Sequence, residues 1–213
     1  MKMFRQFLLI GLAIIALSWF SNSRVWKKSK ALYFPKKEKS KGLSKESLLK
    51  LEQKAAAAKL FVKRKGYNED VCILIDMSLP SGQNRLFIYN LKKDSIATAA
   101  LVAHGNCFEY WMEGRRYSNA IGSGCTSLGK YKIGNSYTGK FGYSYKLYGL
   151  DSSNNNAFVR TVVLHSHSCI PENEVEKEIC QSNGCPTVSP LLLGELKHII
   201  NDSRKPILLW IYN

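Results

Sequence analysis

Sequence signatures of several protein classes are missing from this 213-residue chain. It contains no Cys-x-x-Cys pair and no His-Glu-x-x-His helix, which are two common zinc-binding patterns. The glycines between residues 122 and 149 do not form a Walker-type phosphate loop. The apolar run at residues 7–20 has 14 residues, which is short for a full membrane span. These absences argue against the common zinc motifs and against P-loop nucleotide binding.

Positive charge is concentrated in the N-terminal third of the chain. Residues 1–65 contain 17 of the 31 Lys and Arg but 3 of the 16 Asp and Glu, a balance of +14. Residues 66–213 contain the other 14 basic and 13 acidic residues, a balance of +1. A nucleic-acid-binding domain is expected to carry its charge on the folded part, so no nucleic acid is predicted as a partner. The basic region is expected either to contact anionic lipid or wall polymer, or to be a solvated linker.

The first 23 residues have the composition of an export segment. Two basic residues precede the apolar run at 7–20, whose length suits the core of a signal peptide. No Ala-x-Ala cleavage site follows, and Ser21-x-Ser23 is a weaker candidate. The basic residues at positions 24–30 oppose the positive-inside tendency of an exported segment. We expect residues 1–23 to be either a cleaved signal peptide or a retained membrane anchor.

A basic linker and a helix are predicted for residues 24–65. Ser44 can cap this helix, and Gly66 can end it. Its apolar residues recur at steps of three and four; they are Leu48, Leu51, Ala55, Ala58 and Val62.

A mainly β domain with few helices is predicted for residues 66–213. Short β-rich runs alternate with turns that contain Gly, Asn and Ser. A helix is expected to begin at Ser189-Pro190 and to run to about Ile200. The predicted strands cover residues 71–77, 86–91, 96–104, 131–133, 143–147, 159–165 and 207–212.

A histidine at a strand end and a cysteine in a Ser-Asn-Gly turn form the main catalytic candidate. His165 follows an apolar run, and His167 is separated from Ser182-Asn183-Gly184-Cys185 by fourteen residues. A thiol is a strong nucleophile only as a thiolate, and an imidazole can take its proton. A glycine at position 184 permits a tight bend that aims the amide groups of Gly184 and Cys185 at one point. We therefore predict Cys185 as nucleophile, His165 as base and Gly184 as part of an oxyanion site.

The remaining cysteines have several interpretations. Cys169 and Cys180 bracket a Glu-rich insert and can form a disulfide, and Cys107 with Cys125 is a second candidate pair, although spacing does not determine connectivity. Cys72 lies in an apolar run and is expected to be a buried thiol. A zinc site is an alternative, because soft ligands are close together at positions 165, 167, 169, 180 and 185. An alternating His-x-His-x-Cys strand is unusual for zinc, so neither a metal nor another cofactor is predicted.

The same residues resemble the YkuD-type L,D-transpeptidases of bacterial cell walls. The signature of that family is a histidine, a gap and Ser/Thr-His-Gly-Cys, and here Asn183 stands where most members have the second histidine. The segments Val71–His104 and Ser118–Gly149 resemble the murein L,D-transpeptidase catalytic domain branch, in which Gly-Cys-Pro ends the motif as Gly184-Cys185-Pro186 does here. The likeness extends from Val71 to the C-terminus.

The resemblance implies a YkuD-like β-sandwich fold and acyl transfer on peptidoglycan stem peptides, through a thioester on Cys185. It implies an exported protein, either periplasmic or in the cell envelope. Hydrolysis by the same site, as in an L,D-carboxypeptidase, and a non-catalytic wall-binding module are the alternatives. A papain-like peptidase is disfavoured because there the cysteine precedes the histidine. Supporting or substrate-binding roles are expected for Ser166, His167, Ser182, Asn183, His104 and Ser127.

Overall fold

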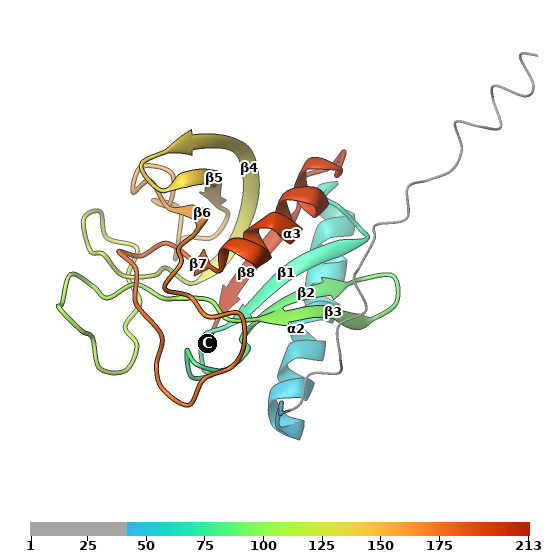
Figure 1. The fold of residues 1–213 in the computed structure, drawn as a ribbon. Helices are drawn as coiled ribbons and strands as arrows, with labels where there is room; N and C mark the ends of the chain where they lie inside the picture. The colour runs from blue at the N-terminus through green and yellow to red at the C-terminus, as the bar shows by residue number, and fades with distance from the viewer. Residues whose placement is uncertain (1–41) are drawn as a thin grey trace, which may run out of the picture. The chain divides into compact units, whose positions relative to one another are not determined.

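The computed structural model describes residues 42–213, whose arrangement Figure 1 shows. The predicted export segment at residues 1–23 and the basic linker up to residue 41 lie outside the described residues. Within residues 42–213, no helix combines the length and the apolar character needed to cross a bilayer.

Helix α2, Lys45–Lys65, begins and ends where the sequence predicts. The Ser44 hydroxyl accepts the Ser47 N–H at the N-terminus, and Gly66 ends the helix with a left-handed φ of 72°. Leu51, Ala55, Ala58 and Val62 form its buried face. Leu48, the first residue of the apolar series, is 40% exposed, so the buried face begins at Leu51.

One eight-stranded sheet forms the body of the described chain, so the fold is mainly β as predicted. The strands follow the order β3-β2-β1-β8-β4-β5-β6-β7. β1 pairs with β8, and β6 with β7, in parallel; the other neighbours are antiparallel. Their bounds are β1 Val71–Asp76, β2 Leu86–Asn90, β3 Ser95–Ala100, β4 Gly129–Gly139, β5 Gly142–Gly149, β6 Val163–Ser166, β7 Thr187–Val188 and β8 Leu208–Tyr212.

Two helices lie on opposite faces of this sheet (Figure 1). α2 packs on β1, β2 and β8 in a cluster that includes Leu74, Phe87 and Leu208. Helix α3, Pro190–Asn201, is capped by Ser189, which accepts the Leu192 N–H. Both faces of β1 are therefore covered, and all six of its residues are buried.

Apart from β4, which covers Gly129–Gly139 where only residues 131–133 were predicted, three strands differ from the prediction. β3 ends at Ala100, because residues 103–106 pair with the segment around Ser182 and Thr187 instead. β6 begins only at Val163, since residues 159–161 form a turn. β7 has only two residues and was not predicted. The first and third differences concern the segment that contains Cys185.

Candidate functional site

Strands β6 and β7 bring the predicted base and nucleophile to one end of the sheet. His165 on β6 is directly opposite Thr187 on β7. Cys185 lies in the bend that leads into β7, two residues before Thr187. The Val163 N–H, two residues before His165, donates to Cys185 Sγ at 3.5 Å. The Cys185 thiol is thus held against the strand that carries His165.

The Cys185 thiol is free and buried. Besides the Val163 contact, its Sγ lies 4.0 Å from the Thr161 carbonyl oxygen, to which it donates. Burial raises the pKa of this thiol, and the Val163 N–H and the nearby Arg160 cation only partly oppose that rise. Cys185 is therefore a neutral thiol at neutral pH.

The His165 ring is held by two hydrogen bonds and one aromatic contact. Nδ1 donates to the Ser166 carbonyl at 3.2 Å, because a carbonyl can only accept. Nε2 of the neutral ring is left to accept the Thr187 hydroxyl, at 3.0 Å. Phe141, at the tip of the β4–β5 hairpin, stacks on the ring with centroids 4.6 Å apart. Burial lowers the pKa of His165, so its basic form persists at neutral pH.

No hydrogen bond joins His165 to Cys185 in the described part of the chain. Thr187 lies between them, since its hydroxyl contacts both His165 Nε2 and, at 3.3 Å, the Cys185 carbonyl oxygen. Direct proton transfer from Sγ to Nε2 thus requires a side-chain rotation. Catalytic hydrogen bonds are often long before substrate binds.

The turn before Cys185 is held by the Ser182 hydroxyl. This hydroxyl donates to the Cys185 carbonyl at 2.6 Å and accepts the Gly184 N–H at 3.2 Å. Gly184 has a φ of +107°, and a Cβ there would lie 2.8 Å from the Cys125 carbonyl oxygen. The Gly184 N–H is thus already hydrogen-bonded in this turn, and its role as an oxyanion donor stays a prediction. The Cys185 N–H has no acceptor among the described residues and is the better candidate.

A second segment, His104-Gly105, supports the same turn from the other side. The Ser182 N–H donates to the His104 carbonyl at 2.8 Å, and the Asn106 N–H donates to the Ser182 carbonyl at 2.7 Å. A Cβ on Gly105 would lie 2.7 Å from Gly184 Cα, so only glycine permits this approach. The backbone of His104 therefore positions the turn.

The imidazole of His104 faces away from Cys185, toward a buried arginine. Arg85, 0% exposed, donates to His104 Nδ1 at 2.9 Å and twice to the Val102 carbonyl. His104 Nε2 has no hydrogen-bond partner among the described residues. Burial and the Arg85 charge lower the pKa of His104 to about 4, so the ring is neutral at physiological pH. The structure supports a packing role for this ring and not a substrate contact.

The other predicted supporting residues are distributed around the site. The Ser166 carbonyl accepts the hydrogen bond from His165 Nδ1. Asn183 is exposed. His167 lies beyond the end of β6, where its Nδ1 accepts the Cys169 N–H. Ser127 is buried and its hydroxyl is 2.7 Å from Tyr131 Oη, so it does not line an open groove.

Both candidate disulfides are present. Cys107 is bonded to Cys125, and Cys169 to Cys180. Cys72 is a buried free thiol, as predicted. The disulfide at 169–180 removes two donors of the alternative zinc set, and no cluster of three His, Cys, Asp or Glu is found within residues 42–213.

Three contacts of the site were not predicted from the sequence. They involve Thr187, Phe141 and Arg160. Arg160 donates to the Ser118 carbonyl at 2.8 Å and to the Cys125 carbonyl, and thereby ties the disulfide-bonded loop to the turn before β6. The sequence offered one clue to the role of Thr187, which lies two residues after Cys185. The other two depend on long-range packing.

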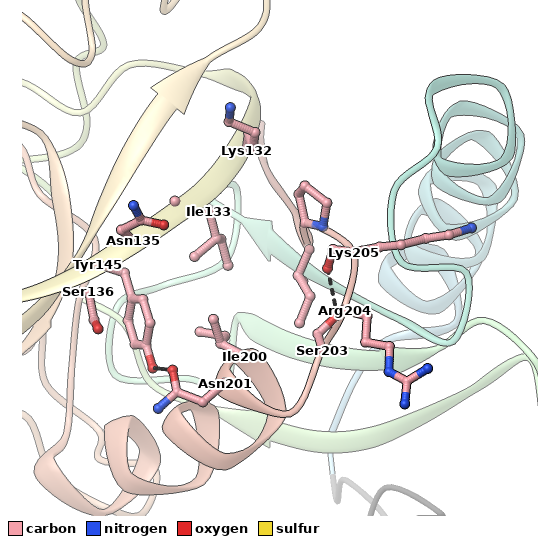
Figure 2. A pocket seen from close by; sticks show the side chains of 13 residues that line it. Lys132, Ile133, Asn135, Ser136, Tyr145, Ile200, Asn201, Ser203, Arg204 and Lys205 are labelled. Atoms are coloured by element: carbon pink, nitrogen blue, oxygen red, sulfur yellow. Dashed lines mark hydrogen bonds between the residues drawn. The ribbon is translucent and has the colours of Figure 1, made fainter. Parts of the chain in front are cut away.

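A polar pocket of about 460 Å³ lies elsewhere, at the C-terminal end of α3 (Figure 2). Tyr145 Oη donates to Asn201 Oδ1 at 2.8 Å in its wall, and Arg204 and Lys205 lie at its edge. Neither Cys185 nor His165 lines it.

This chain matches one family model and is similar to several solved structures. A family model described as an L,D-transpeptidase catalytic domain matches residues 40–212. An L,D-transpeptidase from Xylanimonas cellulosilytica is 17% identical, with a TM-score of 0.38 and coverage of 75% of this chain and 76% of that one. An L,D-transpeptidase from Mycobacterium smegmatis is 9% identical, with a TM-score of 0.40 and coverage of 68% and 59%. The cell shape determining protein Pgp2 from Campylobacter jejuni is 11% identical, with a TM-score of 0.39 and coverage of 67% and 47%. No curated protein sequence matches this chain.

Proposed function

Because this chain belongs to the L,D-transpeptidase catalytic domain family, a peptidoglycan-modifying family, we propose that it transfers acyl groups between peptidoglycan stem peptides with Cys185 as nucleophile. The observation that carries the proposal is the free Cys185 thiol, which accepts the Val163 N–H on the strand that carries His165. Four of the six cysteines are in disulfides, and Cys72 is fully buried. Cys185 is thus the thiol that lies beside an imidazole.

The reaction begins with proton transfer from the Cys185 thiol to His165 Nε2. Sγ attacks the carbonyl carbon of a diamino acid that is linked to a terminal D-amino acid. The Cys185 N–H stabilises the resulting oxyanion. His165 then returns the proton to the leaving amine, the C–N bond breaks, and a thioester remains on Cys185.

The second half of the reaction decides the product. If the side-chain amine of another stem attacks the thioester, a cross-link forms and the thiol is restored. If water attacks, the product is a trimmed stem, and the same site is an L,D-carboxypeptidase. Phe141 stacked on His165 favours the amine, because an apolar ring over the base limits the access of water.

A substrate in the wall requires the catalytic domain to lie outside the cytoplasm. We therefore propose a periplasmic or cell-envelope location, with residues 1–23 as a signal peptide or an anchor. The two disulfides agree with an oxidising compartment. The basic residues up to position 65 are available to contact anionic lipid or wall polymer.

Incubation of the full-length chain with purified muropeptides, followed by mass spectrometry, tests the proposal. We expect an acyl adduct on Cys185, release of a terminal D-amino acid and cross-linked dimers. Trimmed stems without dimers would identify the carboxypeptidase. A chain that binds the muropeptides without any adduct, and equally well as Cys185→Ala, would identify a wall-binding module.

The asparagine at position 183 gives a further test. Asn183 is exposed, and no hydrogen bond of its side chain is found among the described residues, so we expect the natural chain to be active without the usual second histidine. Activity that appears only in Asn183→His would show instead that this chain is a degenerate member of its family.

A further inference from the structure

One part of the sheet face that carries His165 has no helix over it. Residues opposite each other in a ladder point to the same face, as do alternate residues along one strand. Ser144 is opposite His165, and Lys132 is opposite Tyr148. Lys132, Lys146, Tyr148 and His165 therefore share one face. α2 covers that face over β1 and β8, and α3 packs on the opposite face.

Lysine and aromatic side chains alternate across this open area, on β4, β5 and the turn before β6. Lys132 Nζ is 4.7 Å from the centroid of the Tyr148 ring. Lys146 Nζ is 5.7 Å from the Tyr137 ring and 5.8 Å from the Phe158 ring. Tyr148 and Phe158 stack with their planes within 10° of each other. We refer to these five residues as the lysine–aromatic row.

The row is accessible, and its cations are not neutralised. Phe158 is 51% exposed and Tyr137 is 37% exposed. Neither lysine of the row forms an ion pair in the described part of the chain, whereas Lys130, the next lysine on the same face, pairs with Asp151 at 2.8 Å. Exposed aromatic rings that adjoin unpaired cations offer both apolar and polar contacts to a partner.

The row ends beside the proposed nucleophile. Phe158 is followed after one residue by Arg160 and Thr161, and the Thr161 carbonyl is the acceptor of the Cys185 thiol. At the hairpin end, Tyr137 is four residues from Phe141, which stacks on His165. A long ligand that lies along the row therefore reaches both catalytic candidates.

We propose that the lysine–aromatic row binds a glycan strand of peptidoglycan and presents its stem peptides to Cys185; this rests on the proposed function. Pyranose rings have flat C–H faces that stack on exposed aromatic rings. The ammonium groups donate to acetamido and hydroxyl oxygens and to stem carboxylates. Single-stranded nucleic acid also binds lysine–aromatic surfaces. The balance of +1 over residues 66–213 favours the weakly charged glycan over a polyanion.

Binding is measured with the full-length chain carrying Cys185→Ala, so that no turnover occurs. The ligand is purified glycan strands from which an amidase has removed the stem peptides. The test variant adds Lys132→Gln and Phe158→Ala. The matched control adds Lys93→Gln and Leu60→Ala, an exposed lysine and an exposed apolar residue away from the row. Thermal unfolding of each variant checks that it is folded.

We expect the row variant to bind glycan on the order of tenfold more weakly and the control to bind unchanged. Equal binding by the row variant and the control, or no binding by the parent chain, overturns the proposal. Tighter binding of oligo-dT than of glycan, lost at high salt and in the row variant, would assign the row to nucleic acid instead. Acyl transfer by the chain with Cys185 intact is measured separately, so its absence would refute the proposed function without affecting this result.

Discussion

Two buried histidines flank the turn that contains Cys185, and they differ in what surrounds their rings. His104 is enclosed by protein, with Arg85 on Nδ1 and no partner on Nε2 among the described residues. His165 has a hydroxyl on Nε2 and the exposed Phe141 over its ring. Burial lowers the pKa of both rings. A lowered pKa therefore does not distinguish a base from a packed histidine, whereas the groups around each ring do.

Removal of His165 should have the largest effect. In His165→Gln, we expect acyl transfer to fall on the order of a thousandfold, because no base takes the thiol proton. The free energy of unfolding should change by less than about 1 kcal/mol, since glutamine can still pair with Thr187. Release of D-amino acid and urea unfolding measure the two effects. A variant that keeps a tenth of the activity would remove His165 from the mechanism.

Removal of the enclosed histidine should instead reduce stability. We expect His104→Ala to lower the free energy of unfolding by about 2–4 kcal/mol, because it leaves a cavity and removes an acceptor from buried Arg85. Urea unfolding measures this loss. His198→Ala, on the exposed side of α3, is the control and should be neutral. If both variants were equally stable, the Arg85–His104 contact would make no measurable contribution to the free energy of unfolding.

The pH dependence of stability separates the two rings further. His104 has a pKa of about 4 in the folded protein against an ordinary 6.5. The unfolded chain therefore takes up a proton first, and stability is lost as pH falls from about 6.5 to about 4. The loss from this group is on the order of 3 kcal/mol. Denaturation at a series of pH values should show a shallower decline for His104→Gln than for the natural chain, and an unchanged slope would contradict the assignment.

The smallest expected effect concerns the ring over His165. In Phe141→Ala, water reaches the imidazole, and its pKa should move back toward the ordinary value of a histidine. Because the neutral ring is the base, the acid limb of kcat/KM should then move to higher pH. The rate on the plateau should fall only a few-fold. The pH–rate profile tests this, since a purely structural role of Phe141 would lower the rate without moving the limb.

Local sequence predicted most of the secondary structure. Ser44, Gly66 and Ser189-Pro190 end or begin the two helices because capping depends on a few adjacent residues. Strand β7 was missed because two residues do not form a recognisable pattern. β3 was predicted too long because residues 101–104 are apolar enough for a strand, yet they pair with the nucleophile segment.

Local sequence also predicted part of the candidate site, whereas its long-range contacts were missed. His165 and Cys185 are identified by their neighbours in the chain and by the family resemblance. The stacking of Phe141, the contact of Thr187 with His165 and the hydrogen bonds of Arg160 depend on how distant strands are registered. A substrate contact was among the roles expected for His104, because the sequence does not reveal that buried Arg85 contacts its ring.

The burial that keeps Cys185 protonated also makes its thiol slow to oxidise in the folded protein. Peroxides and small disulfides react with thiolates, so a sulfur that ionises only above the ordinary range is attacked slowly. Four cysteines can thus be paired in disulfides while Cys185 stays reduced. In the envelope location that we propose, this low reactivity would keep the thiol available until a substrate arrives.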